Sequence, residues 1–299
     1  MSPKQSLGVL LEPWVASLSQ RSRNTARSYR EAALRFLAVV GEQATDPASI
    51  QAYLGTLHGL SPASRAHHVS AVRSFVRFAM RQGSIPTSPL DLLQRPRVAL
   101  TSGQRYLNAD DLRSLLVASR KVSRTAYAVI LLMASTGLRV SEAASAQWRH
   151  LFRDPDGRLG LIVTGKGGKQ RVIKIPDRLY AVLAELRGSE RLEAKDKTPL
   201  IPDRARTAYS TRALWALVKK ATAAAELDKP VSPHWLRHTA GTLAAKGGAD
   251  VFTIKEAMGH TRLETSMIYI HIARGLEKSL SDYIPDLEKR GRGRPRKQG

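Results

Sequence analysis

Apolar residues recur at the spacing of helix faces through the first hundred residues, and this periodicity limits the fold most. In residues 7–18 and again in residues 32–40, apolar side chains follow the i, i+3, i+4, i+7 pattern of a buried helix face. Two further helices are predicted to begin at Asp46 and Ser61, because each is an N-cap residue followed by a proline. The sequence therefore predicts a helical domain over residues 1–94.

The remainder of the chain combines helices with a small sheet. A stretch interrupted by proline and arginine predicts a linker over residues 95–104. Apolar runs at residues 159–163 and 171–175 are joined by a glycine-rich turn, which predicts an antiparallel pair. Further helices are predicted near residues 177–187, 211–225, 233–246 and 250–258. The expected fold is mainly α with a small antiparallel β-sheet in a second domain, residues 105–285, followed by a basic tail, residues 286–299.

The charge balance indicates a polyanionic partner. Lysine and arginine outnumber aspartate and glutamate by 48 to 25, which gives a net charge of +23. Such an excess favours nucleic acid over a membrane surface. With no cysteine in the chain, a disulfide framework, a thiolate nucleophile and a cysteine-type zinc site are excluded.

The apolar segments do not suggest a membrane protein. The longest apolar run, residues 126–134, is far shorter than the roughly 20 residues that a membrane span needs. Glu12 and Pro13 interrupt the early apolar stretch, which disfavours a signal peptide. A cytoplasmic DNA-binding protein is the expectation.

Five short segments carry residues suited to breaking a DNA phosphodiester. They are TGLRVSE at 136–142, TGKGGK at 164–169, HWLRH at 234–238, MGH at 258–260 and SMIYIH at 266–271. Phosphoryl transfer needs a nucleophile, an acid for the leaving oxygen and cations around the non-bridging oxygens. The segments supply all three kinds of group.

Each residue type in these segments suits a different part of this reaction. Arg139 and Arg237 can each bind two phosphate oxygens with a planar guanidinium, while His234 and His260 can donate single hydrogen bonds. Lys166, a mobile charge in a glycine-rich turn, suits proton delivery, and Tyr269 suits attack on phosphorus. This set requires no metal and no ATP, so no cofactor is predicted.

The five segments, in this order, resemble the tyrosine recombinase (phage integrase) family, most closely its compact Xer-like members. The resemblance covers roughly residues 5–285. Two departures are small: Met258 stands where leucine is common, and Thr265-Ser266 replaces a frequent Thr-Thr. Neither departure is expected to touch the chemistry.

The resemblance implies a mechanism and an assembly. Arg139, Lys166, His234, Arg237 and His260 would surround the scissile phosphate. Tyr269 would attack it to form a 3′-phosphotyrosyl intermediate, and a partner strand's 5′-hydroxyl would then attack that intermediate. The two domains would clamp double-stranded DNA from opposite sides, and a homo-tetramer would form on paired sites, with a dimer on each. Residues 276–284 would pack as a helix onto the neighbouring protomer.

Taken singly, each motif has a plainer interpretation. A lone Lys166 is an ordinary hairpin tip, and Tyr269 among apolar neighbours could be a core tyrosine. His234 and His238 have the spacing of a helical zinc pair, but the segment between them has no glutamate and carries Arg237. Glu142, three residues after Arg139, is expected to orient that arginine by an ion pair. A type IB topoisomerase and a non-catalytic DNA-binding protein remain the alternatives to a recombinase.

Arginines in the first domain suggest a DNA-facing surface. Four of them form an i, i+4 stripe on the helix predicted after Ser61, and Arg27 lies among other arginines on an earlier helix. The stripe consists of Arg65, Arg73, Arg77 and Arg81. A basic stripe is often only a solvated helix face. No carboxylates interleave with these arginines in the sequence, which favours the DNA-binding interpretation.

The last residues form a separate motif. Residues 289–297 are basic, lack apolar side chains and contain Arg-Gly-Arg-Pro, with Arg292 and Arg294 at its centre. This run resembles an AT-hook, which places arginines in the narrow minor groove of A·T-rich DNA. The alternative is a polybasic tail that contacts phosphates without base preference.

Overall fold

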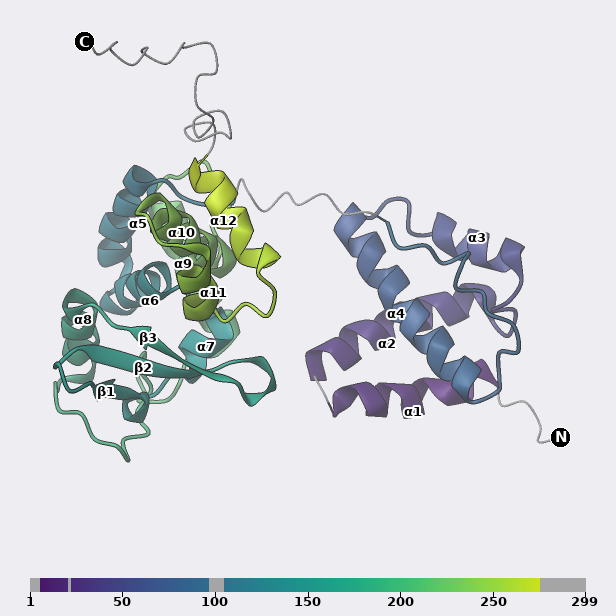
Figure 1. The fold of residues 1–299 in the computed structure, drawn as a ribbon, viewed down its shortest axis with the longest axis horizontal. Helices are drawn as coiled ribbons and strands as arrows, with labels where there is room; N and C mark the ends of the chain where they lie inside the picture. The colour runs from purple at the N-terminus through teal and green to yellow at the C-terminus, as the bar shows by residue number, and fades with distance from the viewer. Residues whose placement is uncertain (1–5, 21–22, 97–104, 275–299) are drawn as a thin grey trace, which may run out of the picture. The chain divides into compact units, whose positions relative to one another are not determined.

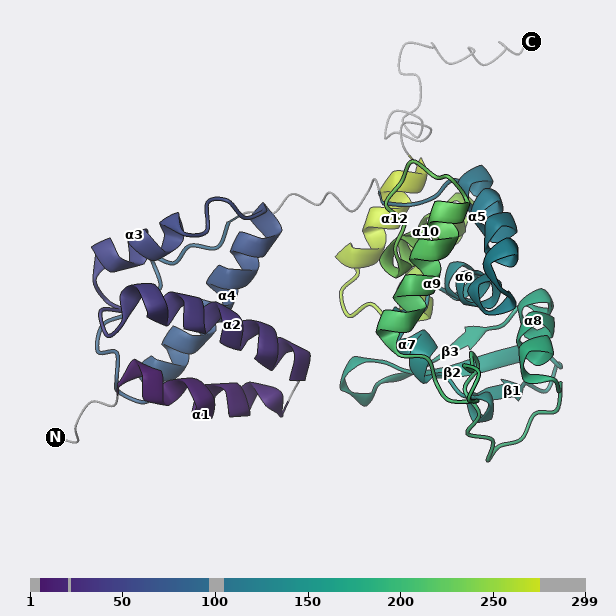
Figure 2. The ribbon, with the colours of Figure 1, turned by 180° about the vertical axis from the view of Figure 1, so that it is seen from behind.

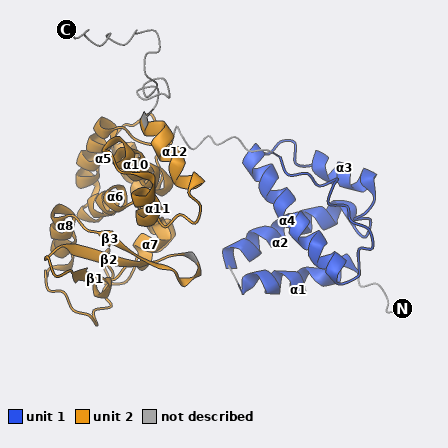
Figure 3. Cartoon of the chain, in the orientation of Figure 1, with its two compact units in different colours: residues 1–100 blue, residues 101–299 orange. Residues whose placement is uncertain are grey.

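The computed structural model describes residues 6–20, 23–96 and 105–274, and these divide into two compact units, residues 1–100 and 101–299 (Figure 3). Each unit has its own buried apolar core. The predicted linker lies mostly outside the described residues, and the C-terminal tail and residues 276–284 lie entirely outside them. Within the described residues no helix is long and apolar enough to cross a membrane.

The described residues of the first unit form four helices (Figure 1). They are α1 (Leu7–Ser19), α2 (Arg23–Val40), α3 (Pro47–Gly55) and α4 (Pro62–Arg81). Asp46 and Ser61 accept hydrogen bonds from backbone N–H groups at the starts of α3 and α4, as the sequence predicted. The apolar face of α1 is buried in the core of this unit. In that core the rings of Trp14 and Phe75 lie with their centroids 5.2 Å apart.

The second unit surrounds one helix that is apolar on all sides. α6 (Arg124–Thr136) is buried along most of its length and contacts α5 (Ala109–Val122), α8 (Asp177–Arg187), α9 (Thr211–Ala224) and α10 (Pro233–Lys246). Such a helix needs neighbours on every side, because none of its faces suits water. The short α7 (Val140–Ser145) follows α6 directly.

A three-stranded antiparallel sheet lies beside these helices (Figures 1 and 2). Its order is β1 (Leu151–Arg153), β2 (Leu159–Thr164) and β3 (Gln170–Lys174), with Leu161 opposite both Leu151 and Ile173. The pairing of β2 with β3 was predicted, whereas β1 was not. The turn Lys166–Gly168 joins β2 to β3 as a short 3-10 segment.

Two helices complete the second unit. α11 (Val251–Met258) and α12 (Glu264–Arg274) contact each other and α10, and they share a small apolar cluster that includes Tyr269. The helices predicted near residues 177–187, 211–225, 233–246 and 250–258 are present, at bounds within a residue or two. The mainly helical fold with a small antiparallel sheet is therefore confirmed.

Candidate active site

Arg237 holds two of the five motif segments together. Its side chain projects from α10 and is buried, with the residue only 3% exposed. One terminal nitrogen donates to the Gly137 carbonyl and the other to the Met258 carbonyl, both at 2.6 Å. Burial, followed by the nearby Arg139 guanidinium, lowers the pKa of Arg237 to about 10. The guanidinium still has N–H groups left for a phosphate, because each terminal nitrogen carries two hydrogens.

Arg139 lies at the start of α7 and is anchored by Glu142. The Arg139 backbone N–H donates to Glu142 Oε2 at 2.8 Å, and its Nη1 donates to Oε1 at 2.9 Å. The Glu142 side chain is 5% exposed, whereas that of Arg139 is 41% exposed. The predicted ion pair is confirmed, and the remaining donors of Arg139 face an open cavity.

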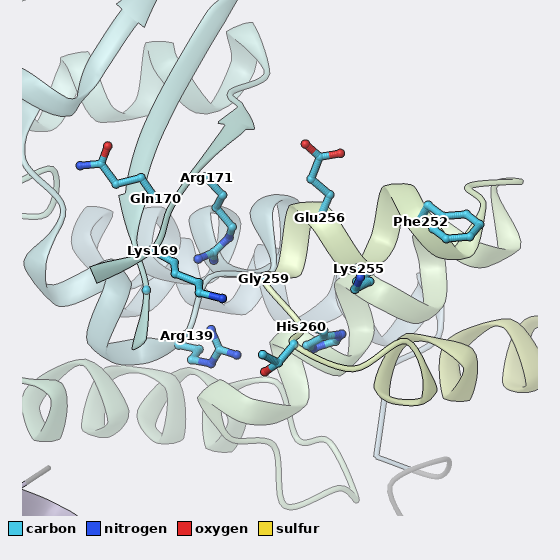
Figure 4. Close-up of a pocket in the computed structure, with 11 residues that line it drawn as sticks. Arg139, Lys169, Gln170, Arg171, Phe252, Lys255, Glu256, Gly259 and His260 are labelled. Carbon is cyan, nitrogen blue, oxygen red and sulfur yellow. The ribbon is translucent and has the colours of Figure 1, made fainter. Parts of the chain in front are cut away.

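That cavity has a volume of about 550 Å³ and is rich in cations. Arg139 and His260 line it together with Lys169, Arg171 and Lys255 (Figure 4). Lys169, Arg171 and Lys255 were not singled out in the sequence, because their function depends on the way β3 and α11 fold together. His234, Arg237 and Tyr269 do not line the cavity.

His260 is held by a hydroxyl group. Its Nδ1 lies 2.8 Å from Ser266 Oγ, and Ser266 is fully buried. Burial, followed by the charges of Arg237 and Arg139, lowers the pKa of His260 to about 4, so the imidazole is neutral near pH 7. Ser266, part of the Thr265-Ser266 departure, directly contacts a site residue. That this departure leaves the chemistry unchanged stays a prediction.

His234 and His238 contact each other rather than standing apart. Their Nε2 atoms are 2.9 Å apart, so one ring donates and the other accepts. Burial and the charge of Arg237 lower the pKa of His234. Burial, followed by His234, lowers the pKa of His238 to about 4. His238 therefore fixes the orientation of His234, a role that the sequence pattern did not indicate.

Tyr269 projects from α12 into the interior of the unit and is 2% exposed. Its ring stacks on His260 at a centroid distance of 6.0 Å and lies 5.6 Å from His238. A Cβ at Gly241 of α10 would lie only 2.9 Å from two ring carbons, so the ring occupies space that any other residue would fill. Burial raises the pKa of Tyr269, while Arg237 and Arg139 oppose this increase. Tyr269 is thus a packed residue whose pKa is also affected by the positive charge of the site.

Lys166 lies in the turn between β2 and β3, but its side chain is outside the described part of the structure. The turn is closed by a hydrogen bond from the Gly165 N–H to the Lys169 carbonyl at 2.8 Å. The role of Lys166 therefore stays a prediction. Arg292 and Arg294 also lie outside the described residues.

The arginines of the first unit differ in their surroundings. Arg77 and Arg81 are exposed on α4, whereas Arg73 donates to the backbone carbonyls of Leu90 and Leu93, the latter at 2.9 Å. Arg65 is half-buried, and its Nε is buried without a hydrogen-bond partner. Arg73 thus has a structural contact that the stripe alone did not predict.

Two arginines of α2 pair with carboxylates that lie outside the arginine-rich stretch in sequence. Exposed Arg27 pairs with Glu31 at 3.5 Å, and Arg30 pairs with Glu12 at 2.7 Å. Exposed pairs of this kind contribute little to stability, so they leave the arginines available to DNA.

Comparison with known proteins identifies the class. Residues 105–275 match the phage integrase family, and residues 11–83 match the phage integrase N-terminal SAM-like domain. The chain therefore belongs to the phage integrase family and is a tyrosine recombinase, an enzyme that cleaves DNA and exchanges its strands. This finding confirms the recombinase interpretation over the topoisomerase alternative.

Individual relatives agree with the family. The chain is 36% identical to the tyrosine recombinase XerD of Caulobacter vibrioides over 270 residues, which cover 84% of this chain and 87% of XerD. It is 30% identical to XerC of Xanthomonas campestris pv. campestris over 276 residues, covering 88% and 84% of the two chains.

Solved structures share the fold. A lambda integrase tetramer bound to a Holliday junction is similar at a TM-score of 0.72 and 18% identity, covering 90% of this chain and 78% of that one. XerH bound to palindromic difH in a post-cleavage complex is similar at a TM-score of 0.70 and 21% identity, covering 85% and 80%.

Proposed function

We propose that Tyr269 is the nucleophile of this recombinase and that Arg139, Arg237, His234 and His260 bind the scissile phosphate. The observation that supports this most is the meeting of motif segments distant in sequence. Arg237 joins the turns at Gly137 and Met258, and the Tyr269 ring stacks on His260. Tyrosine, guanidinium and imidazole groups thus lie within one small region beside a cationic cavity.

The proposed reaction needs no external energy source. The Tyr269 oxygen forms a bond to phosphorus as the bond to the 5′-oxygen breaks, and Lys166 gives that oxygen its proton. The tyrosine must lose its own proton. His238 and His260 are neutral in the free enzyme, and a bound phosphate would raise their pKa toward the range of a general base. A 5′-hydroxyl of another strand then attacks the 3′-phosphotyrosyl bond, so each bond broken is replaced by another of the same kind.

The two arginines stabilise charge that develops on the non-bridging oxygens. Arg139, Arg171 and Arg237 surround a single carboxylate, Glu142, so the region retains positive charge for a phosphate. Donors already fixed in place lower the barrier, since they do not have to reorient during the reaction. Arg77 and Arg81, exposed on α4, are proposed to contact duplex DNA from the first unit together with Arg27. Arg65 and Arg73, on the same helix, are proposed to support this contact with DNA.

We further propose that the enzyme acts in the cytoplasm as a homo-tetramer on paired sites. Strand exchange between two duplexes requires four cleavages, and therefore four active sites. Lambda integrase, which shares this fold, has been solved as a tetramer bound to a Holliday junction. Whether the natural event is integration, excision or resolution follows from the target sites.

Replacing Tyr269 with phenylalanine tests the assignment of the nucleophile. The substitution Tyr269→Phe removes only the attacking oxygen, so duplex binding should persist while covalent adducts disappear. A suicide substrate nicked near the cleavage point traps the adduct, which a denaturing gel resolves. Adducts formed by the phenylalanine variant would refute the assignment and would show that another residue is the nucleophile. Added EDTA should leave wild-type cleavage unchanged.

The role of Lys166 can be separated from that of the arginines. Lys166→Ala should cleave an ordinary phosphodiester slowly but should cleave a substrate with sulfur at the 5′-bridging position at nearly the wild-type rate. A thiolate leaves without a proton, whereas an alkoxide requires one. Arg139→Ala and Arg237→Ala serve as controls and should not recover, because they stabilise the non-bridging oxygens. Equal recovery of all three variants would show that Lys166 has no special role in proton delivery.

A further inference from the structure

Arg171 connects three of the motif segments through one buried guanidinium. It lies on β3, and its side chain is 9% exposed. Nη1 donates to Glu142 Oε1 at 3.0 Å and Nη2 donates to Oε2 at 2.8 Å, which makes a bidentate pair with a carboxylate on α7. Nε donates to the Ala257 carbonyl at 2.8 Å, at the end of α11 and directly before Met258.

Two glycines of the motifs lie next to this guanidinium. Gly259 has a φ of +62°, and a Cβ there would lie 3.1 Å from Arg171 Nη1 and 3.2 Å from its Cδ. A Cβ at Gly165 would lie 3.5 Å from the same nitrogen and 3.8 Å from Glu142 Oε1. The guanidinium is thus enclosed by the turn that carries Lys166 and the turn that carries His260. Gly259 is therefore needed for the close approach and for its left-handed backbone, whereas a Cβ at Gly165 would make ordinary van der Waals contact.

The ion pair also determines how Arg139 is used. Glu142 accepts from the Arg139 backbone and Nη1 as well as from both terminal nitrogens of Arg171. Burial raises the pKa of Glu142, but hydrogen bonds led by those of Arg171 outweigh burial, so the pKa is lowered overall and the carboxylate stays charged. With Arg171 present, Glu142 is satisfied and Arg139 keeps donors for the phosphate. Without it, a buried carboxylate would draw Arg139 toward itself.

We propose that Arg171 is a positioning residue that aligns Arg139 for the phosphate, acting through Glu142, while it holds the turns of Lys166 and His260 in register. This inference rests on the proposed function of the site and adds a residue to it. Arg171 does not itself need to contact the reacting atoms. Its place on the inner face of β3, beside buried Ile173, is where a strand normally carries an apolar side chain.

The test compares two substrates with Arg171→Lys and Arg171→Ala. Single-turnover adduct formation is measured on a suicide duplex with a normal scissile phosphate and on one with a methylphosphonate, which lacks one non-bridging charge. On the phosphate, both variants should be slower by about 100-fold or more, comparable to the loss of one preorganised charge donor. On the methylphosphonate the deficit should shrink at least tenfold, because the charge that Arg139 stabilises is absent.

Two controls make the result specific. Arg158→Ala removes an exposed arginine that pairs with Asp154 beside the same sheet, and it should change neither rate. The double variant with Glu142→Gln should be no slower than the slower single variant, since both changes remove the same ion pair. Melting temperature and duplex binding are measured for every variant, and the lysine variant, which keeps the charge but not the fork, decides the outcome if the alanine variant does not fold.

The outcomes separate this inference from the proposed function. An equal deficit on both substrates, or fully additive losses in the double variant, would overturn the positioning role of Arg171. A wild-type rate for Arg171→Lys would also overturn it. If Arg139→Ala itself is not improved by the methylphosphonate, the proposed phosphate contact of Arg139 fails instead.

Discussion

At the scale of single residues, the site keeps its imidazoles neutral by burying them and by placing guanidinium groups near them. Arg237 contributes to the lowered pKa of His234, of His238 and of His260, in each case after burial. A neutral imidazole can accept a proton at one nitrogen and donate at the other. These rings become effective proton acceptors only when their pKa rises, and a bound phosphate would raise it by reducing the repulsion that keeps them uncharged.

This arrangement predicts that folding stability depends on acidity. His238 and His260 have a folded pKa of about 4, below the usual value of about 6.5. Well above pH 6.5 these rings are neutral in both the folded and the unfolded state, so they take nothing from the free energy of unfolding. As the pH falls from 6.5 toward 4, the unfolded chain binds protons at these rings that the folded chain does not, so stability is lost over that window.

Melting temperatures measured between pH 7.5 and pH 4.5 check this expectation. The wild-type protein should melt at progressively lower temperature as the pH falls below 6.5. His238→Gln removes one of the groups and should give a shallower dependence. A melting temperature that is independent of pH over this range, or an unchanged slope in the variant, would contradict it.

At the scale of elements, local sequence signals were sufficient wherever a helix begins with its own cap. Asn108 accepts from the Asp111 N–H, and Asp46 and Ser61 cap α3 and α4 as predicted. These caps are readable because donor and acceptor lie within three residues of each other. Local signals also predicted most helices of the second unit and the pairing of β2 with β3, but they did not predict β1 or α12.

Contacts between distant segments could not be predicted in this way. The Arg237 bond to Gly137 spans 100 residues, and the Arg171 bond to Ala257 spans 86. Strand β1 is only three residues long and exists because β2 pairs with it. The six proposed catalytic residues were found through resemblance to a family, whereas Arg171 and Ser266 became evident only once the elements were assembled. The sequence did offer one signal for Arg171: this residue stands on the inner face of a strand, where an apolar side chain is usual.

One element-scale prediction concerns residues 276–284, which were expected to dock on a neighbouring protomer. A groove of about 520 Å³ between α10, α11 and α12 has apolar walls that include Val251, Phe252 and Ile270, and we predict that it receives this segment from another copy. Truncation after Arg274 should abolish recombination between two sites while single-site binding stays measurable. Synapsis is followed by a native gel with two labelled duplexes.

Filling the groove provides the matched change. Ala273→Trp alters one wall of the groove without removing the docking segment, and it should reduce synapsis while cleavage of an isolated suicide site persists. A truncated protein that still recombines two sites would refute the docking prediction.

At the scale of the whole molecule, positive charge is the dominant property. The net charge of +23 belongs to a chain with two separate cores, so the attraction to DNA is not confined to the active site. Each phosphate neutralised by lysine or arginine releases a counterion, which makes the affinity fall steeply with salt. Binding constants for this protein therefore have meaning only at a stated salt concentration.

Deletion of the final residues tests whether their positive charge favours A·T-rich DNA. Deleting residues 289–299 should weaken binding more on A·T-rich flanks than on G·C-rich flanks if Arg292 and Arg294 enter the minor groove. Arg292→Ala or Arg294→Ala should then reproduce most of the loss, while Lys297→Ala should not. Equal losses on both flanks, with a flatter salt slope, would reduce the segment to phosphate contacts. Titrations by fluorescence anisotropy on the two flank types measure the difference.

Gly241 sets a limit on how far this enzyme can be made resistant to heat. A glycine inside a helix usually costs about 1 kcal/mol relative to alanine, so it would be an early target for engineering. In α10, however, the missing methyl group is the space that the Tyr269 ring occupies. An alanine would have to displace the ring of the proposed nucleophile. A laboratory selection for thermal resistance alone would therefore be drawn toward a change that impairs catalysis, whereas a selection that also requires recombination would retain the weaker helix.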